Sequence, residues 1–352
     1  MDTTTGVPPE LHAHLPQGVS VHEHATARHT SAYLAAGDPD DPVVLLCHGW
    51  PELGRSWVRV MEPLAAAGFR VVAPDMRGYG ASRVHPSPGD YAIAEAVLDM
   101  CELFEHLGVD AESPAFAIGH DYGAPVVWNL ATHHPELLAG VAGVCVPHLP
   151  PGTSLVDHID RDLYPAEQYP LGQWDYLVAH VRMPEALAAE FDGDVRGMLA
   201  SIMRAGNPRA MERPVPNATV QERGGWFPNG HPYHEPDTRV LDEIEFEALV
   251  ASLSHTGFTA ANSWYQNNRA NAAYAEDAIT GGRITVPALF VHARYDATCA
   301  TLTTTAADPM RSACEDLREE IVEAGHWVAQ EQPVALTEAL LRWLRPLRPV
   351  ST

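Results

Sequence analysis

Short apolar runs alternate with helix-like stretches along most of this 352-residue chain, and this alternation limits the fold more than any other feature. Four runs are apolar almost throughout, as strands buried on both faces of a sheet are: 43–49, 69–75, 114–121 and 138–147. Stretches with the spacing of helices lie between them: 56–68, 92–108 and 124–134. Strands that alternate with helices form right-handed crossovers, so we expect an α/β fold with a mostly parallel sheet flanked by helices.

The alternation stops after Val146 and resumes with the apolar run 284–296. The intervening sequence is rich in Pro, Trp and Asn, has helix-like segments and contains no apolar strand. We therefore expect a mostly helical cap domain at 147–281, inserted into an α/β core that comprises 1–146 and 282–352. Ligands of open α/β sheets bind beyond the carboxyl ends of the strands, so this cap should form a roof over a site there.

The two ends of the chain complete the expected sheet. Residues 19–27 and 30–37 alternate between polar and apolar side chains, as antiparallel strands do. Near the other end, 317–326 is predicted as the last strand and 334–344 as the final helix. The sequence does not determine how 204–236, which is expected to lie over the site, is folded.

Residues 117–125, AIGHDYGAP, have the layout of a nucleophile elbow. In such an elbow a strand ends in a sharp turn into a helix, with small residues two positions before and two after an exposed side chain. Gly119 and Gly123 are the small residues here, and the central position, usually a serine, is Asp121. We therefore predict a carboxylate nucleophile at the carboxyl edge of the sheet.

Two partners of such a nucleophile follow it in the order that α/β-hydrolases use, which is nucleophile, acid and histidine. Asp296 closes the strand that reads LFVHARYD, and His326 follows the last predicted strand. Because all three side chains lie just past strand ends, they can meet at one edge of the sheet. We expect His326 to be the general base and Asp296 to orient it.

The turn CHGWPE (47–52) follows the first central strand directly. Such a turn can aim the backbone N–H of Trp50 toward the nucleophile. Together with the N–H of Tyr122, the residue after the nucleophile, it would form an oxyanion hole.

An aspartate nucleophile points to a particular chemistry. A carboxylate that attacks an ester or amide would give an unfavourable anhydride, whereas attack on a strained or activated sp³ carbon gives an alkyl ester. Epoxides and carbon–halogen bonds both fit. A halide leaves as a weakly basic anion that needs N–H donors, often indoles, whereas an epoxide oxygen leaves as a basic alkoxide that needs a proton. Tyrosine, with a pKa of about 10, can supply that proton.

The chain resembles the soluble epoxide hydrolases of the α/β-hydrolase fold. The similar segments are HGWPE, PDMRGYGAS, GHDYGA, WDYL, GGWFPNG, GFTAANSWYQN, ARYD and GHW, which extend from about residue 43 to 345. That family uses two cap tyrosines to bind and protonate the epoxide oxygen, and the resemblance assigns these roles to Tyr265 and Tyr176. His180 competes with Tyr176 for the second role, because some relatives carry a histidine in this region. The implied reaction converts an epoxide and water to a vicinal diol.

Further residues are predicted to line the substrate site, namely Trp174, Trp264, His48 and Pro51. The alternative to an epoxide hydrolase is a hydrolytic dehalogenase with the same triad, although haloalkane dehalogenases place tryptophan where this chain has Tyr122. A non-catalytic ligand receptor on this fold is disfavoured, because such proteins often lose a member of the triad and this chain keeps all three. A carboxylesterase is disfavoured by the absence of the serine.

Charge and composition exclude several partners. The formal net charge is −24, and all 22 basic side chains are arginine, so we expect no binding to nucleic acid or to anionic membranes. Arginine without lysine is typical of a bacterial genome of high G+C content. The five widely spaced cysteines, together with the absence of a signal-like or membrane-spanning segment, favour a reduced, cytoplasmic protein. We expect no metal and no cofactor, only a small epoxide and water, and a homodimer is one of the assemblies left open.

Overall fold

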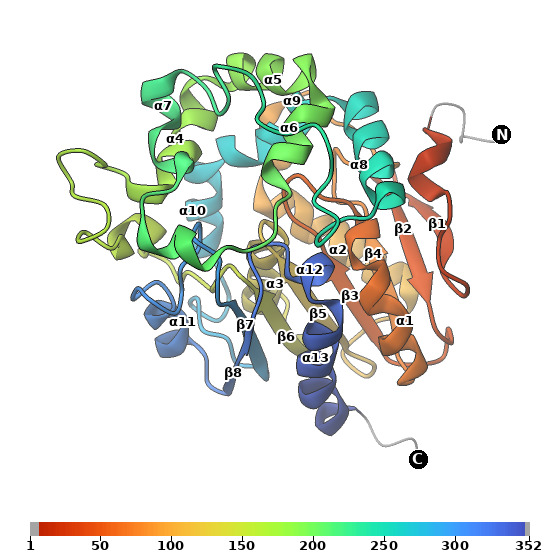
Figure 1. Cartoon of the computed structure of the whole chain (residues 1–352). Helices are drawn as coiled ribbons and strands as arrows, with labels where there is room; N and C mark the ends of the chain where they lie inside the picture. Colours follow the sequence, from red (N-terminus) through yellow and green to blue (C-terminus); the bar gives the residue numbers. More distant parts are fainter. Residues whose placement is uncertain (1–6, 349–352) are drawn as a thin grey trace.

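Eight strands form one sheet in the computed structural model, which describes residues 7–348 (Figure 1). Their bounds are β1 Ser20–Ala25, β2 Thr30–Ala36, β3 Val43–Cys47, β4 Arg70–Pro74, β5 Ala115–His120, β6 Leu138–Val144, β7 Ala288–Ala293 and β8 Leu317–Val322. The strand order is β1-β2-β4-β3-β5-β6-β7-β8. The pairs β1–β2 and β2–β4 are antiparallel, and every pair from β4 to β8 is parallel. The expectation of a mostly parallel α/β sheet is confirmed.

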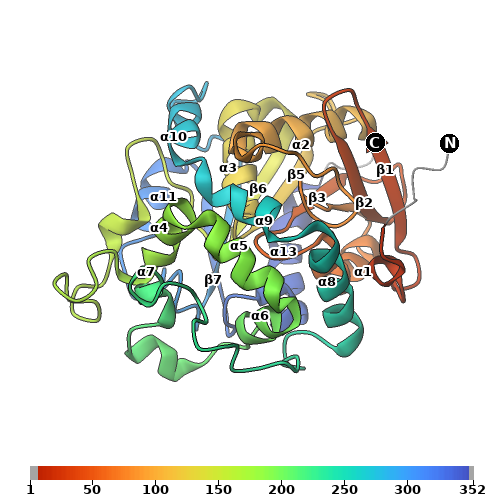
Figure 2. The ribbon, with the colours of Figure 1, turned by 90° about the horizontal axis from the view of Figure 1, so that it is seen from above.

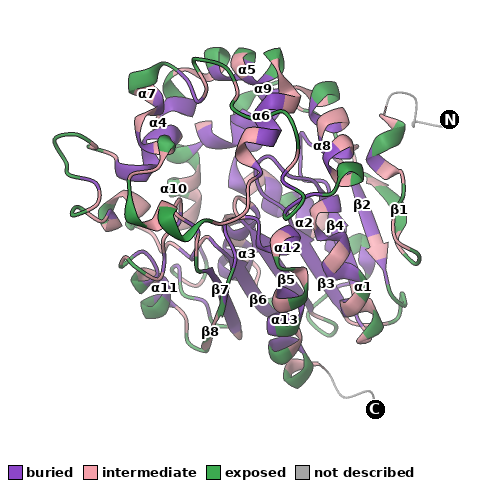
Figure 3. Ribbon diagram, viewed as in Figure 1, coloured by how far each residue is buried: buried purple, intermediate pink, exposed green. Residues whose placement is uncertain are grey.

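Both faces of the central strands are buried because helices cover each side of the sheet (Figures 2 and 3). The core helices are α1 Val58–Ala66, α2 Ile93–Leu107, α3 Gly123–His133, α11 Asp308–Ala313, α12 Val328–Glu331 and α13 Pro333–Leu347. Alternate residues of β3 show this burial directly. Val44 and Leu46 pack in one apolar cluster with α1 and α13, whereas Leu45 and Cys47 pack in another with α2 and α3. Because both faces of β3 are buried, nearly every residue of the strand is apolar, as the sequence shows.

Between β6 and β7 the chain forms helices and no strand of the sheet, and these helices lie over the carboxyl ends of the strands (Figures 1 and 2). They are α4 Asp175–Arg182, α5 Pro184–Gly193, α6 Val195–Ile202, α7 Val220–Arg223, α8 Glu243–Thr256, α9 Phe258–Ser263 and α10 Asn268–Glu276. The expected insertion is thus mostly helical, and its role as a cap stays a prediction. Its limits at 147 and 281 stay a prediction.

Short 3₁₀ helices complete the connections. Their bounds are Pro9–His12, Gly54–Trp57, Pro88–Tyr91, Pro135–Leu137, Leu155–His158, Gly172–Trp174, Pro208–Glu212, Pro216–Thr219 and Trp264–Gln266. Two of them, with α7, make up most of the regular structure in the segment 204–236, whose fold the sequence left open.

Among residues 7–348, no helix combines the length and the apolar character that a membrane span requires. All five cysteines are free thiols; Cys47, Cys145 and Cys299 are buried, and Cys101 and Cys314 are partly exposed.

Candidate active site

The turn that carries Asp121 can form only because glycines flank it. β5 ends at His120, Asp121 has a positive φ of 48°, and α3 begins at Gly123. A Cβ on Gly119 would lie 2.1 Å from the carbonyl oxygen of Gly123, and one on Gly123 would lie 2.2 Å from that of Cys47. No larger residue fits at either place. The left-handed backbone at Asp121 is a strained conformation of the kind that is retained at functional sites.

The three predicted triad residues meet at the carboxyl edge of the sheet. Asp121 follows β5, Asp296 follows β7 and His326 follows β8. His326 Nε2 lies 3.4 Å from Asp121 Oδ2, and His326 Nδ1 lies 2.7 Å from Asp296 Oδ2. The imidazole therefore has a carboxylate at each ring nitrogen, a geometry in which both nitrogens can carry a proton.

Burial and nearby charges have opposite effects on the pKa values of Asp296 and His326. Burial raises the pKa of Asp296, but His326 and the N–H groups of Thr298 and Cys299, each 3.0 Å from Asp296 Oδ1, outweigh it and lower the pKa. Burial likewise lowers the pKa of His326, whereas Asp296 and Asp121 raise it well above its ordinary value. Asp296 therefore stays ionised, and the free site favours an imidazolium between two carboxylates.

The turn after β3 brings one predicted oxyanion donor to the nucleophile. The N–H of Trp50 donates to Asp121 Oδ1 at 2.8 Å. Gly49 permits this approach, since a Cβ there would lie 2.3 Å from the Cβ of Asp121. His48 holds the turn: its Nε2 accepts from the N–H of Met76 at 2.9 Å, and its Nδ1 lies 2.8 Å from the carbonyl oxygen of Gly49. Among the hydrogen bonds of the described chain, none comes from the N–H of Tyr122.

A buried ion pair, which the sequence analysis missed, supports the backbone of His326. His120 Nδ1 lies 2.7 Å from Glu52 Oε2, and His120 Nε2 lies 2.8 Å from the carbonyl oxygen of His326. Gln330 donates to the other oxygen of Glu52 at 2.6 Å, and the N–H of Gly49 donates to the first at 3.1 Å. Despite burial, each partner stabilises the charge of the other, so the pKa of Glu52 falls to about 2 and that of His120 rises to about 10.

Replacing His120 with glutamine should destabilise the protein in a pH-dependent way. The pKa of His120 rises from 6.5 to about 10 on folding, so its stabilisation is complete below pH 6.5 and is lost as the pH approaches 10. We expect H120Q to lower the free energy of unfolding by about 3–5 kcal/mol near pH 6, because it leaves Glu52 unpaired. The deficit should shrink toward pH 10 in urea titrations. A deficit that stays constant with pH would contradict this, and the uncharged double variant E52Q/H120Q is the control.

Both predicted tyrosines line the same cavity as Asp121. Tyr176 comes from α4 and Tyr265 from the 3₁₀ helix Trp264–Gln266, and their ring centroids are 5.9 Å apart. Burial raises the pKa of each well above 10, and the charge of Asp121 adds to the shift. The two phenols are therefore protonated at neutral pH and can donate to a basic oxygen in the cavity.

His180, the alternative to Tyr176, is not part of the cavity lining. It is completely buried and stacks on Tyr265 with ring centroids 4.2 Å apart. Neither ring nitrogen has a hydrogen-bond partner within the described chain, and burial lowers its pKa to about 3. A neutral imidazole behind Tyr265 supports the ring rather than supplying a proton to the cavity.

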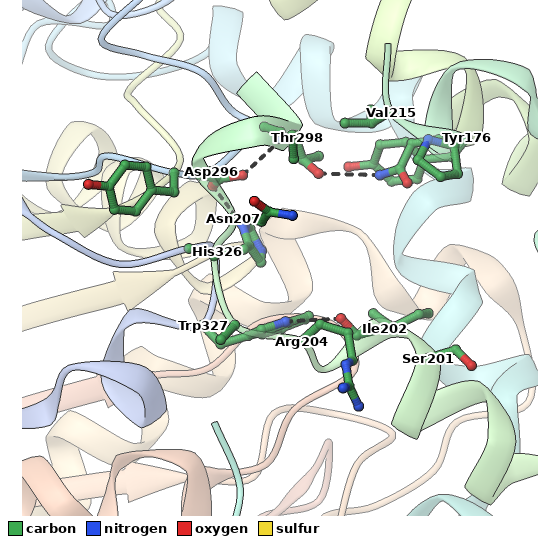
Figure 4. Close-up of a pocket in the computed structure, with 18 of the residues that line it drawn as sticks. Tyr176, Ser201, Ile202, Arg204, Asn207, Val215, Asp296, Thr298, His326 and Trp327 are labelled. Carbon is green, nitrogen blue, oxygen red and sulfur yellow. Dashed lines mark hydrogen bonds and ion pairs between the residues drawn. The ribbon is translucent and has the colours of Figure 1, made fainter. Parts of the chain in front are cut away.

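The cavity has a volume of about 710 Å³, and much of its wall comes from the segment 204–236 (Figure 4). The cap residues of that segment that line it are Arg204, Ala205, Gly206, Asn207, Pro208, Ala210, Val215, Pro216, Asn217, Trp226, Phe227 and Tyr233. The sequence analysis assigned no role to these residues, although GGWFPNG was one of the segments that carried the resemblance. The volume lies in the range of small-molecule sites.

Four residues predicted as substrate contacts are not among the residues that line this cavity, so their contact with substrate stays a prediction. Both ring nitrogens of His48 contact backbone atoms, of Gly49 and Met76, and Pro51 is buried in the turn. Trp264 donates its indole N–H to the carbonyl oxygen of Arg77 at 3.2 Å, and Trp174 is 3% exposed. Their side chains pack behind the wall, a distinction that proximity in sequence does not reveal.

One group of metal-type ligands occurs within residues 7–348, and it consists of His120, Cys145 and His326 with atoms less than 4.8 Å apart. Both imidazoles already pair with carboxylates, Glu52 and Asp296 respectively. We assign no metal to this group.

Comparison with known proteins agrees with this architecture. A family model described as the alpha/beta hydrolase fold matches residues 42–186. Epoxide hydrolase A of Mycobacterium tuberculosis is 32% identical over 323 residues, which cover 89% of this chain and 94% of that protein. The crystal structure of epoxide hydrolase A from Mycobacterium thermoresistibile is 30% identical, covers 93% of this chain and 98% of its own, and has a TM-score of 0.76.

An epoxide hydrolase from an endophytic Streptomyces superposes with a TM-score of 0.77 at 26% identity, covering 94% of this chain and 97% of that one. The fold and the site thus define a member of the α/β-hydrolase fold class. Within this class, the chain belongs to the epoxide hydrolase family. The resemblance identified from the sequence is confirmed.

Proposed function

We propose that this enzyme hydrolyses an epoxide to a vicinal diol through a covalent ester on Asp121. The observation that carries the proposal is the convergence of two kinds of group on one cavity. A carboxylate with a histidine and a second acid lies on the core side, and two protonated phenols lie on the cap side. The family name of the relatives agrees with this chemistry. The cap, predicted at 147–281, would close the cavity over the substrate.

In the first step, Asp121 attacks an epoxide carbon from the side opposite the departing oxygen. The C–O bond of the strained ring breaks, and an alkyl ester forms on the aspartate. Tyr176 and Tyr265 donate hydrogen bonds to the oxygen, and one of them transfers its proton as the alkoxide develops. The charge of Asp121 raises the pKa of both phenols, so its loss on ester formation makes them stronger acids when the proton is needed.

In the second step, the imidazolium of His326 first returns a proton to the tyrosinate left by the first step, and the neutral imidazole then takes a proton from the water that attacks the carbonyl carbon of the ester. The tetrahedral intermediate collapses, the bond between the carbonyl carbon and the alkyl oxygen breaks, and His326 passes its proton to the departing diol oxygen. The new carboxylic acid of Asp121 then protonates His326, which restores the starting state. The N–H of Trp50, which donates to Asp121 Oδ1 at 2.8 Å in the free enzyme, would stabilise the tetrahedral oxyanion with the N–H of Tyr122. Ester formation also removes one of the two carboxylates that raise the pKa of His326. The imidazole therefore becomes easier to deprotonate when a general base is required.

The dehalogenase alternative is disfavoured by the indoles of the cavity. Three tryptophans line it, and two of them already donate their N–H groups: Trp50 to Asn262 Oδ1 at 3.1 Å and Trp327 to the carbonyl oxygen of Ile202 at 3.2 Å. Trp226 is left as the lining indole whose N–H has no partner among the described residues. A halide would have to rely on this single indole, whereas an epoxide oxygen is served by both phenols.

A single turnover in water enriched in ¹⁸O tests the covalent route. With the enzyme in excess over a styrene-type epoxide, the first diol should take its new oxygen from Asp121 and carry no label. Later turnovers should carry ¹⁸O, because hydrolysis of the ester leaves solvent oxygen in the carboxylate. Label in the first diol, measured by mass spectrometry, would exclude the ester. Halide release from a matched haloalkane, assayed in parallel, distinguishes the dehalogenase.

A further inference from the structure

The backbone beside His326 is tied to the cap by one carboxylate. Glu331, at the end of α12, accepts two hydrogen bonds on its Oε2 atom, from the N–H of Gly206 at 3.0 Å and from the N–H of Gly325 at 2.9 Å. Gly206 belongs to the helical insertion, and Gly325 directly precedes His326. We refer to Glu331, Gly206 and Gly325 as the clasp.

The two glycines of the clasp pack backbone against backbone. A Cβ on Gly206 would lie 2.4 Å from the nitrogen of Gly325, and a Cβ on Gly325 would lie 2.5 Å from the Cα of Gly206. A second link lies close by, since Trp327 donates its indole N–H to the carbonyl oxygen of Ile202 at 3.2 Å (Figure 4). The residues on both sides of His326 thus contact the cap, and these contacts form part of the cavity wall.

The backbone of His326 is therefore held from two directions. From one direction, His120 Nε2 lies 2.8 Å from its carbonyl oxygen. From the other direction, Glu331 accepts from the peptide N–H of Gly325, immediately before it. Both contacts are internal to the core. The second shares its acceptor oxygen with the N–H of Gly206, so the clasp is complete only while the cap segment at Gly206 is docked.

We propose that Glu331 is a positioning residue that makes the placement of His326 depend on cap docking. This inference rests on the proposed function, in which His326 acts only in the second step. Formation of the ester needs Asp121 and the two phenols, and the hydrogen bonds of the clasp involve none of these three side chains. Loss of the clasp should therefore slow hydrolysis of the ester while leaving its formation largely intact.

The test compares the two steps in four variants of the full-length enzyme. E331A removes both hydrogen bonds, whereas E331Q keeps an acceptor oxygen at the same place. G206A keeps Glu331 but forces the cap segment away from Gly325. E338A removes an exposed carboxylate from α13 and is the matched control. After rapid mixing with a styrene-type epoxide, intact-protein mass spectrometry follows the ester, and diol release is measured in parallel.

We expect E331A to accumulate the ester, with hydrolysis slowed about tenfold or more and ester formation within about twofold of wild type. G206A should also slow hydrolysis of the ester, but because Gly206 lines the cavity, the comparison of the two steps is made on E331A. E331Q and E338A should behave like wild type. Equal losses in both steps for E331A would show a merely structural role and overturn the proposal, as would wild-type ester hydrolysis in E331A. An H326Q variant measured in parallel separates failure of the role proposed for Glu331 from failure of the covalent mechanism. If it forms no ester, the proposed function itself fails.

Discussion

Replacing His326 with glutamine is expected to stop the reaction after one alkylation of Asp121. The histidine acts in the proposed second step alone, so the ester should form and persist. Steady-state diol production should fall about 10⁴-fold, the scale of losing the central base of a triad. Intact-protein mass spectrometry should show one added substrate mass per chain, and peptide mapping should place it on Asp121.

The control for this experiment is Asp121→Ala, which removes the nucleophile and should give neither adduct nor diol. Glutamine at 326 keeps a polar side chain of similar size, and thermal unfolding checks that the variant is folded. An H326Q enzyme that releases diol at the wild-type rate would contradict the assignment of the base. An adduct on a residue other than Asp121 would contradict the assignment of the nucleophile.

The strands of the core were predictable because their signal is local. β3 and β5 are buried along their whole length, and a strand buried on both faces must be apolar at every position. The elbow was predictable for a related reason. Close backbone contacts at Gly119 and Gly123 exclude every side chain, so the requirement is written into the sequence as glycine.

Interactions between segments that are distant in sequence were harder to predict from the sequence. Glu52 and His120 are 68 positions apart, and only the parallel pairing of β3 with β5 brings their ends together. In the sequence, Glu52 lies in the turn 47–52 and His120 lies in the elbow 117–125, and nothing in either motif indicates that the two side chains pair. Glu331 and Gly206 are farther apart still, at 125 positions, and meet through docking of the cap. A motif locates a residue on a turn but does not show what packs against that turn.

The cap illustrates the same limit. The segment 204–236 has little regular structure, so no periodicity in the sequence could indicate which of its side chains face the cavity. Trp264, an aromatic residue next to a predicted functional tyrosine, was predicted to contact the substrate but is not among the residues that line the cavity. Its indole N–H is satisfied by the backbone of Arg77, which fixes the ring behind the wall. Adjacent residues on a helix point in different directions, and tertiary hydrogen bonds determine which one reaches the substrate.

Replacing both Tyr176 and Tyr265 with phenylalanine is expected to abolish epoxide opening. Each hydroxyl supplies a proton or a hydrogen bond to the leaving oxygen, and general acid catalysis of this kind contributes about 10²–10⁴-fold. A single replacement should cost about 10²-fold, because the remaining phenol still serves the oxygen, whereas the double variant should fall to background. Rapid-mixing measurements of ester formation check this step directly, since the loss should appear before the ester.

Whether Y176F/Y265F loses epoxide opening alone or all activity shows whether the two tyrosines act as acids or only pack. Both rings are buried, and removing an oxygen from each preserves the edge-to-face contact whose centroids are 5.9 Å apart. Displacement of a good leaving group from a haloalkane needs no proton, so any such activity should survive in Y176F/Y265F. If epoxide opening persists in Y176F/Y265F, the phenols are not the acids, and the proposed first step is wrong. If ester formation is unchanged and hydrolysis slows, the tyrosines act on the second step, and the order of proton transfers proposed above is wrong.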